Sequence, residues 1–551
     1  MRTSLLAATA ALVTHLVPVA AAQAPQPGLT LFNPNNDTTT YLIDEAGRVV
    51  HTWSFADFPG NTVFLEEDGT LLRTKKVAGG PTIGGYGGGI QRATFDGAIT
   101  WDFLVSDATK KAHHNALSLP NGNVLMIVWE RLTAADAIAA GRDPALLGGN
   151  VWLPDMLLEF QQTGPTTATE VWRWRAMDHL IQDFDPTRPN FGVVADHPGR
   201  IDINFPPTVT NNGDWMHANS LSYDPVHDQV LICVPFHDEI WVIDKSTTTA
   251  EAAGSTGGKS GKGGDILWRW GNPAAYDRGT QADQELFNQH GAMFIEQGRP
   301  GAGNVLLFNN QVPGPPQHSE IWELVRPVDA GGAYAPLAPG QAHGPAAPSW
   351  SYVAPNPADL DSAFLSGAQR MPNGNTLICS GAQSLFLEVA PDGTEVWQYT
   401  NGFTSAGNTF VFQNRRYQRW LWSDGSELSA AAGGVVGFDL LAGSTHAGDL
   451  YLLLGSTGGT DPGYPIDGQL LPLVVTDAFF LATLTQANQG PFGGTLGVLD
   501  PLGKGTATLT VPPGVAGPAA GLVAHHAFVA LDPATLAVTL ASNAVPLVVT
   551  P

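Results

Sequence analysis

The sequence is poor in basic residues and in charge of either sign. Its 551 residues include 26 lysines and arginines against 50 acidic residues, a formal net charge of −24, and charged residues make up only 14% of the chain. So acidic a chain argues against nucleic acid or an anionic membrane surface as a partner. A hydrophobic content of 43% predicts a folded protein and not a disordered one.

Long hydrophobic runs are also missing. After the first 22 residues no segment reaches 18 consecutive apolar residues, so no stable membrane span is expected. Residues Met1–Ala22 resemble a secretory signal, with Arg2 at the start, an apolar run over Leu5–Val19 and small residues at the cleavage site. We therefore expect an exported protein that is periplasmic, attached to the cell envelope or secreted.

Cysteine is nearly absent, since the chain has only Cys233 and Cys379. An exported protein invites a disulfide interpretation. However, the two residues occupy the same place in two copies of a repeat, QVLICVP and NTLICSG, and equivalent places in separate repeat units are too far apart for an S–S bond. We predict two buried free thiols.

Glycine and proline are abundant, and they punctuate a repeat. Its clearest copy lies in the stretch Asp214–Asp244, DWMHANSLSYDPVHDQVLICVPFHDEIWVID, which reads as short antiparallel strands separated by turns. Each copy is a strand, a turn and a second strand, the pattern of a β-hairpin. Further copies are NTVFLEEDGTLLR, HHNALSLPNGNVLMI, QHGAMFIEQGRPGAGNVLLF and SGAQRMPNGNTLIC.

A second hairpin with a tryptophan-bearing strand follows most copies, for example IQRATFDGAITWDF and LFLEVAPDGTEVWQY. Four strands per unit are typical of a β-propeller blade. Five full units lie between Asn61 and Tyr399, with a half unit at Leu29–Trp53 and one extra strand at Asn408–Tyr417. Pairing of the two ends would close the ring and remove its free edge. We predict an all-β fold with a six-bladed β-propeller over residues 29–417, with five and seven blades as alternatives.

The composition changes after Tyr417. Tryptophan becomes scarce, and alternating strands such as GDLYLLLG, GTATLTVPP and HHAFVALD appear. This pattern predicts a C-terminal β-sandwich over residues 430–551. It contains no catalytic cluster, so we interpret it as an accessory domain, with adhesion or docking as an alternative.

Histidines recur at one position of the repeat. Aligning the units on their turns places His114 and His290 at the same strand entry, with Asn61 as a counterpart, and the spacing H-x-N relates His113 to His217. First residues of innermost strands converge at one mouth of a propeller, so these histidines are expected to share a funnel. Such a cluster can bind an anion, act as acid, base or nucleophile, or hold a metal. Carboxylates are missing from the matched positions, so we predict no metal and no cofactor.

The most specific blocks of the repeat resemble a known family. DWMHANSLSYDP, LIC…HDEIWVID, WRWG, FNQHGAMF, NVLLFNN, GAQRMPNGNTLICSG and PDGTEVWQY are similar to the bacterial arylsulfate sulfotransferases, over most of residues Leu29–Tyr417. The resemblance implies a six-bladed periplasmic propeller that moves a sulfuryl group from a phenolic sulfate ester to a phenol. It implies a sulfated histidine intermediate and no nucleotide.

The resemblance also implies site residues. His217 and His290 match channel histidines that hold the sulfate, and His113 and His114 are further catalytic candidates. Asn219 and Asn61 are expected to contact the substrate. A cationic centre of this kind would stabilise the charge that develops on the sulfuryl oxygens and the leaving phenolic oxygen.

Two features depart from the family pattern. Members carry an arginine shortly after the NVLLF strand, whereas FNNQVPGPPQHSEIWEL has none, and His318 is the nearest cationic substitute for binding substrate. Members also present a nucleophilic histidine in a late blade, where this chain offers Gln383 and Ser384.

These departures keep other functions open. One alternative is a non-catalytic propeller that binds a ligand or an envelope partner. A quinone-dependent dehydrogenase would need a carboxylate set for calcium and often adjacent cysteines, and neither is visible. The donor, the acceptor and the oligomeric state are not indicated by the sequence.

Overall fold

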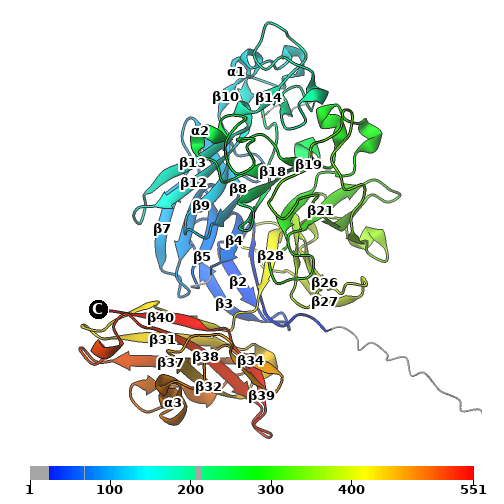
Figure 1. The fold of residues 1–551 in the computed structure, drawn as a ribbon. Coiled ribbons are helices and arrows are strands. Elements are labelled where there is room, and N and C mark those ends of the chain that lie inside the picture. The colour runs from blue at the N-terminus through cyan, green and yellow to red at the C-terminus, as the bar shows by residue number, and fades with distance from the viewer. Residues whose placement is uncertain (1–23, 67–68, 207–211) are drawn as a thin grey trace, which may run out of the picture.

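The computed structural model describes residues 24–66, 69–206 and 212–551. The predicted signal segment, residues 1–22, lies outside the described residues. Strands dominate the chain, and they form two bodies, one on each side of residue 417 (Figure 1). In the described part, no helix is both long and apolar enough to span a bilayer.

The first body is built from six four-stranded antiparallel sheets. The first sheet joins the last strand of this body to its first three: β28 (Val411–Tyr417), β1 (Leu29–Pro34), β2 (Thr39–Ile43) and β3 (Val49–Ser54). The second and third are β4 (Pro59–Leu65), β5 (Leu71–Lys76), β6 (Gly88–Ala93), β7 (Ile99–Leu104), and β8 (Lys110–Ser118), β9 (Val124–Glu130), β12 (Asp155–Gln162), β13 (Ala168–Arg175).

The remaining three sheets take their strands in chain order. The fourth is β16 (Ser220–Asp224), β17 (Gln229–Val234), β18 (Glu239–Asp244) and β19 (Trp268–Trp270). The fifth is β20 (His290–Phe294), β21 (Val305–Val312), β22 (His318–Leu324) and β23 (Trp350–Tyr352). The sixth is β24 (Ser366–Arg370), β25 (Thr376–Ser380), β26 (Leu385–Val389) and β27 (Glu395–Thr400).

The innermost strands form a closed cycle. Strands β4, β8, β16, β20, β24 and β28 each contact the next, and β28 returns to β4. The cycle closes because β28 pairs antiparallel with β1, from Leu29 opposite Tyr417 to Pro34 opposite Val411. The pairing of the two ends of the repeat region, expected from the sequence, is therefore present, and it leaves no free edge at the seam.

The alternation of side chains between the two faces of each strand explains how neighbouring sheets pack. In β9, Leu125 and Ile127 belong to the core shared with the fourth sheet, whereas Val124, Met126 and Val128 belong to the core shared with the second. Successive side chains of a strand point to opposite faces, so a sheet buried on both faces needs an unbroken apolar run. The sequence VLMIVW in β9 has this character.

The two cysteines are free and buried, as predicted. Cys233 lies in β17 and Cys379 in β25, the second strands of the fourth and sixth sheets. Burial raises the pKa of both thiols, to about 12 for Cys233, so neither is a reactive thiolate at neutral pH.

The two ends of the ring differ. Short hairpin turns such as residues 119–123 lie at one end, which we call the turn end. The other end, where the innermost strands begin, carries the long connections and is called the loop end (top of Figure 1). The short elements of those connections are β10 (Leu132–Thr133), α1 (Ala134–Ala139), β11 (Val151–Trp152), β14 (Leu180–Ile181) and β15 (Ile201–Asp202). A further short helix, α2 (Thr249–Ala252), lies in the connection between β18 and β19.

The second body has two larger sheets and a small hairpin. One sheet is β29 (Leu421–Ser423), β31 (Gly434–Leu441), β37 (Lys504–Val511) and β35 (Phe492–Gly493). The other is β30 (Glu427–Ser429), β40 (Val545–Thr550), β38 (Val523–Leu531), β32 (Leu450–Ser456) and β36 (Leu496–Val498), with β39 (Val538–Ala541) on β38. The hairpin is β33 (Tyr464–Ile466) and β34 (Gln469–Leu471), and the one longer helix is α3 (Ala478–Thr485). Both sheets contribute to one core, for example through Phe438 and Phe528.

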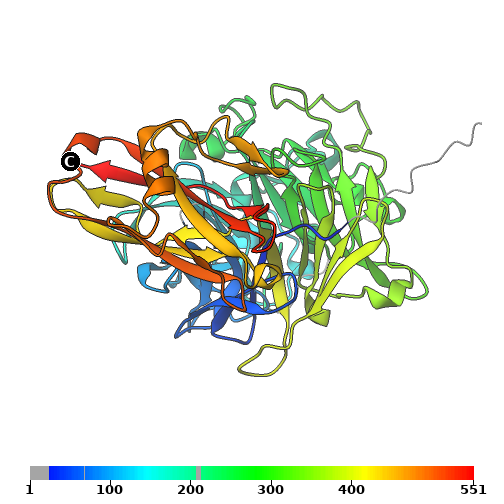
Figure 2. The same cartoon turned by 90° about the horizontal axis from the view of Figure 1, so that it is seen from below.

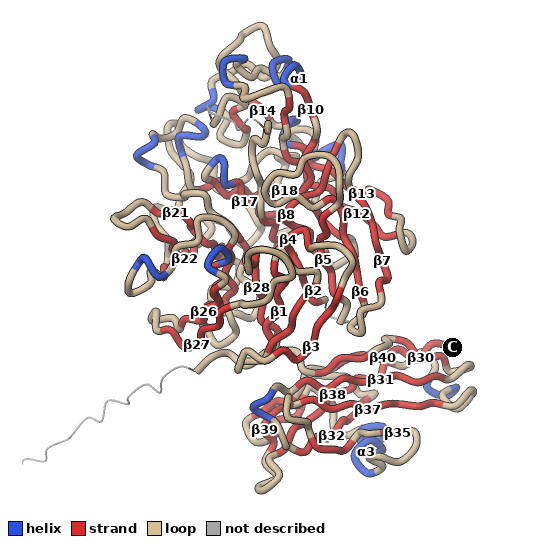
Figure 3. The backbone as a smooth tube through the Cα atoms, turned by 180° about the vertical axis from the view of Figure 1, so that it is seen from behind, coloured by secondary structure: helices blue, strands red, loops and turns tan. Residues whose placement is uncertain are grey.

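The second body packs against the turn end, beside the first two sheets (Figures 2 and 3). The indole of Trp422 stacks on Phe95, with ring centroids 4.8 Å apart. Asp44 of the first body accepts a hydrogen bond from the backbone N–H of Ser444 at 3.1 Å. The loop end remains on the far side of the ring from this contact.

Candidate active site

Three of the predicted histidines meet at the loop end of the ring. His114 lies within β8 at a bulge between Ala112 and Ala116, His217 precedes β16, and His290 is the first residue of β20. His114 and His217 have φ angles of 49° and 54°, a left-handed conformation that non-glycine residues rarely adopt. Unusual backbone of this kind is typical of functional sites, because it re-aims a side chain out of the strand pattern.

The rings of these residues are neighbours. The centroids of His114 and His217 are 4.6 Å apart and the rings are nearly perpendicular. The ring centroid of Phe412, in β28, lies 5.8 Å from that of His114 and 6.4 Å from that of His290, so the phenyl ring neighbours both histidines. All three histidines are buried or nearly so, which makes their protonation states depend on one another.

His113 joins His114 to a carboxylate. His113 Nδ1 lies 2.8 Å from His114 Nδ1, and His113 Nε2 lies 2.9 Å from Oδ1 of Asp155. The other oxygen of Asp155 accepts the backbone N–H of Ala218 at 2.8 Å. Asp155, His113 and His114 therefore form one hydrogen-bonded chain, and Nε2 of His114 has no hydrogen-bond partner among the described residues.

His217 has a carboxylate of its own. Its Nδ1–H donates to Oδ2 of Asp214 at 2.5 Å, and the indole N–H of Trp129 donates to the other oxygen at 3.2 Å. The ring of Trp129 also stacks on that of His113, with ring centroids 4.0 Å apart. One tryptophan therefore contacts both the His113–Asp155 pair and the His217–Asp214 pair. A short parallel bridge between Leu153 and Asp214 brings the two carboxylate segments side by side.

Burial and these partners divide the cluster into neutral and cationic members. Burial lowers the pKa of His113 and His114 well below the usual value, and it lowers that of His290 to about 4. Burial also acts against a charged His217, but the charge and hydrogen bond of Asp214 outweigh it and raise the pKa of that ring above 6.5. Burial and the charge of Asp214 raise the pKa of Asp155 well above its usual range.

His290 is oriented by two acceptors. Its Nδ1 lies 2.9 Å from the backbone oxygen of Asn288 and 3.0 Å from Oδ1 of Asn310. Two acceptors place the proton of the neutral ring on Nδ1, so Nε2 carries the lone pair. Asn310 is itself fixed, because its amide donates to the hydroxyl oxygen of Ser366 at 3.0 Å.

A glycine-rich loop covers the histidine rings. Gly85 has a φ angle of 77°, and a Cβ atom there would lie 1.9 Å from Cε1 and Nε2 of His114. A Cβ on Gly84 would lie 3.8 Å from Cε1 of His217. Asn61 holds this loop by donating to the oxygen of Gly85 at 3.0 Å. Within the described residues, the backbone amides of Gly84 and Gly85 donate no hydrogen bond.

Two of the predicted substrate-binding residues have other contacts. The side chain of Asn219 is fully buried and donates to the backbone oxygen of Gln289 at 2.9 Å, which ties the fourth sheet to the fifth. His318 begins β22, outside the innermost ring, and its Nε2 lies 2.9 Å from Glu320. Asn61 is connected to the histidine cluster indirectly, through the hydrogen bond that its amide donates to the backbone oxygen of Gly85. No group of three or more metal-ligating side chains is found within residues 24–66, 69–206 and 212–551.

Sequence reasoning missed the carboxylates and the loop. Asp214 stands three residues before His217, and Asp155 opens a strand of the third sheet. Neither lies at the strand entry that the histidines share, so alignment of the units at that entry could not reveal them. The glycine run over residues 79–89 was a visible signal, because such a run allows backbone to approach a ligand or ring closely.

Comparisons with known proteins identify a family. The family model described as Arylsulfotransferase (ASST) matches residues 16–415. No curated protein sequence matches the chain.

Among solved structures, a protein of unknown function from Bacteroides caccae is 11% identical, with a TM-score of 0.40 over 71% of this chain and 99% of that one. Virginiamycin B lyase from Staphylococcus aureus is 10% identical, with a TM-score of 0.32 over 70% and 84%. TM-scores this low do not support a fold assignment, so the fold is assigned from the strand pairing of the chain itself.

Proposed function

The chain belongs to the arylsulfotransferase family, and from this premise we propose that it transfers a sulfuryl group from a phenolic sulfate ester to a phenol through a sulfated His114. The observation that carries the choice of His114 is the hydrogen-bonded chain Asp155–His113–His114. With Asp155 ionised, His113 donates from Nε2 and accepts at Nδ1 the proton of His114 Nδ1. That arrangement leaves the lone pair of His114 on Nε2, which is the nucleophilic atom.

In the first half of the reaction, Nε2 of His114 attacks sulfur. The N–S bond forms, the bond between sulfur and the phenolic oxygen breaks, and the phenolate leaves with the electron pair. The cationic ring of His217 donates its proton to that phenolate. The Nδ1 proton of the sulfated His114 moves to His113, which passes its Nε2 proton to Asp155. The raised pKa of Asp155 suits it to hold this proton.

In the second half, an acceptor phenol attacks the same sulfur. Neutral His217 removes the proton of the phenol, the new S–O bond forms and the N–S bond breaks. Protons return along the chain from Asp155 to His113 and from His113 to Nδ1 of His114. Atoms and charges balance over the two halves, and no nucleotide takes part.

The charge on the sulfuryl oxygens is balanced without an arginine after β21. His217 is the cationic member of the cluster, and the amides of Gly84 and Gly85 supply free donors beside His217 and His114. Donors fixed in a water-poor site stabilise developing charge at low reorganisation cost. This set replaces His318, which was the expected cationic substitute.

The finer features of the fold and location belong to the same proposal. We take the six sheets of residues 29–417 as six propeller blades and residues 430–551 as an accessory β-sandwich. We take residues 1–22 as an export signal, so that the enzyme acts outside the cytoplasm. The substrates are small aryl sulfates and phenols.

Turnover of 4-nitrophenyl sulfate by the purified protein tests the proposal. We expect nitrophenol release that depends on added phenol, and loss of at least about 10³-fold in kcat in the variants His114→Ala and His217→Ala. His446→Ala, in the second body, is the matched control and keeps full activity. Unchanged turnover in His114→Ala would reject that residue as nucleophile, and no turnover by the unaltered protein would favour a non-catalytic, ligand-binding propeller.

A further inference from the structure

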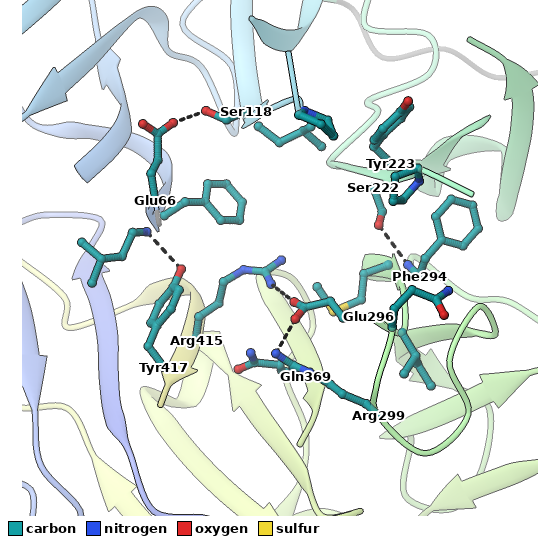
Figure 4. Close-up of a pocket in the computed structure, with 18 of the residues that line it drawn as sticks. Glu66, Ser118, Ser222, Tyr223, Phe294, Glu296, Arg299, Gln369, Arg415 and Tyr417 are labelled. Atoms are coloured by element: carbon teal, nitrogen blue, oxygen red, sulfur yellow. Dashed lines mark hydrogen bonds and ion pairs between the residues drawn. The ribbon is translucent and has the colours of Figure 1, made fainter. Parts of the chain in front are cut away.

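A large cavity opens at the turn end of the ring, at the opposite end from the histidines. Its volume is about 1060 Å³. Figure 4 shows side chains from several innermost strands pointing into it, with the guanidinium group of Arg415 near its middle. Pockets of several hundred Å³ are large enough to hold a small organic molecule.

The innermost strands supply both apolar and charged side chains to the cavity lining. Every one of them contributes, through Phe64, Leu117, Leu221, Met293, Gln369 and Arg415 among others. They also contribute Asp224 and Arg416, whose charges are paired with Arg326 and Glu388, whereas among the described residues Arg415 has only Glu296, at 3.7 Å. Apolar side chains beside one weakly paired cation fit a ligand that has an apolar body and one negative group.

Arg415 has unused hydrogen-bonding capacity. Its guanidinium carries five N–H donors. Among the described residues its one ion pair is with Glu296, at 3.7 Å between Nη1 and Oε1, and its Nε is buried without a partner. The group stacks over Phe64, with Cζ 4.7 Å from the ring centroid. The side chain is only 15% exposed, so water does little to satisfy these donors.

The charge of the lining is opposite in sign to that of the chain. The cavity is lined by five arginines and three carboxylates, whereas the whole protein carries −24. One arginine, Arg416, is neutralised by buried Glu388, and Asp224 is neutralised by Arg326. With Arg416 and Asp224 set aside, four arginines and two carboxylates, Glu66 and Glu296, remain in the lining. The lining therefore carries a net positive charge. A local positive field in an acidic protein attracts anions to this place.

We propose that this cavity is a second binding site, for a small aromatic molecule that carries an oxyanion group. The aromatic body lies against Leu117, Leu221 and Met293, and the oxyanion takes the free donors of Arg415. The planar guanidinium suits a sulfonate, sulfate or carboxylate because it presents two parallel N–H groups. The inference goes beyond the proposed sulfuryl transfer and is independent of it, since no residue is shared with the histidine cluster.

Calorimetric titration of the full chain with naphthalene-2-sulfonate tests the site. This probe carries its sulfur on carbon, so it cannot donate a sulfuryl group to a histidine. We expect saturable binding that weakens at least about tenfold in Arg415→Gln, because a charge-assisted bidentate contact is lost. Arg173→Gln, at a surface pair with Glu170, is the matched control and keeps the affinity of the unaltered protein.

Two further variants keep the test decisive if Arg415→Gln folds poorly. Glu296→Gln removes the carboxylate that competes for Arg415, and we expect it to tighten binding severalfold. His217→Ala distinguishes the two ends of the ring, and we expect it to leave the affinity unchanged. The inference is overturned by absence of saturable binding, by equal affinity in Arg415→Gln, by no tightening in Glu296→Gln, or by loss of binding in His217→Ala.

Discussion

At the scale of single residues, Asp155 is the group that, in the proposed mechanism, decides whether His114 is a nucleophile or an acid. When Asp155 is ionised, the chain leaves a lone pair on Nε2 of His114, and when it is protonated, the chain places a proton there. Its buried position and the neighbouring Asp214 raise the pKa of Asp155, which favours the protonated state relative to the ionised one. A carboxylate that both sets a tautomer and stores a proton supports each half of the reaction.

Replacing Asp155 by asparagine tests this role. The amide of the Asp155→Asn variant cannot take the proton of the sulfated intermediate, so we expect kcat for 4-nitrophenyl sulfate to fall by about 10²–10⁴-fold, the range of general acid–base catalysis. The binding of substrate should change little, because Asp155 reaches the reacting nitrogen only through His113. Steady-state kinetics with a thermal unfolding control separate the outcomes, and a large rise in KM with unchanged kcat contradicts the assignment.

The pH dependence of turnover follows from the same residues. Activity should rise with pH as the Asp155–His113–His114 chain loses one proton, above pH 3.8 because the pKa of Asp155 is raised. It should fall as His217 loses its proton, above pH 6.5 because the pKa of His217 is raised.

Asp214→Asn separates the two limbs of this bell-shaped profile. Asp214 is the group that raises the pKa of His217, so its removal should move the alkaline limb to lower pH. The comparison comes from kcat/KM of both proteins, measured from about pH 4 to about pH 10, a range that spans the ordinary pKa values of carboxyl and imidazole groups. An alkaline limb that stays in place speaks against His217 as the required acid.

At the scale of elements, the glycine-rich loop before β6 shapes the site. Gly85 packs its backbone into the space beside Nε2 of His114 that a side chain would fill. The loop is held there by Asn61 and by the N–H of His114, which donates to the oxygen of Gly85 at 2.8 Å. The approach of backbone to a histidine ring therefore depends on the missing Cβ.

Gly85→Ala should displace His114. The added Cβ would lie 1.9 Å from the ring at a φ angle of 77°, so we expect loss of about 1–3 kcal/mol of stability and a strong loss of turnover. Gly79→Ala is the matched control in the same loop, because Gly79 has a φ angle of 82° and nothing within 4 Å of its added Cβ. Equal activity in the two variants, measured beside chemical unfolding, contradicts the packing argument.

Much of the fold could be predicted from the sequence, because the strands repeat. Asn-Gly and Asp-Gly turns and tryptophan-ended strands mark the hairpins, and the half unit at Leu29–Trp53 anticipates the pairing of β1 with β28. The histidines were found because repeat positions converge on one end of a ring. Asp155, Asp214 and Phe412 were not found, since none of them is a histidine of the repeat and each reaches the cluster through tertiary folding. Within the described residues we found no residue for the late-blade histidine that the family resemblance implies, and Phe412 of the last strand lies beside His114 and His290.

At the scale of the whole molecule, the seam between the first and last strands holds the ring together. Arg416 of β28 forms a fully buried ion pair with Glu388, and its Nε donates to Oγ1 of Thr30 at 3.0 Å. Glu388 also accepts the backbone N–H of Gln26 at 2.6 Å. One buried pair thus joins the start of the described chain, the sixth sheet and the closing strand.

Removing one partner should weaken the closed ring. Glu388→Gln leaves a buried guanidinium without its counter-charge, and we expect the free energy of unfolding to fall by about 3–5 kcal/mol. Glu170→Gln, at the surface pair with Arg173, should cost less than about 1 kcal/mol. Denaturant unfolding of both variants measures the difference, and similar losses in the two would show that the seam does not depend on this pair.

The most direct test of sulfuryl transfer through His114 is to locate the sulfuryl group on the protein. The purified protein is incubated with 4-nitrophenyl sulfate without acceptor, stopped in alkali and digested for mass mapping, with a gain of about 80 Da expected for one sulfuryl group on a nucleophile. We expect this gain on His114, we expect added phenol to remove it, and we expect Asp155→Asn to accumulate it slowly or not at all. A gain on His217, on His290 or on any other residue, or no gain while nitrophenol is released, would contradict the assignment of His114 as nucleophile.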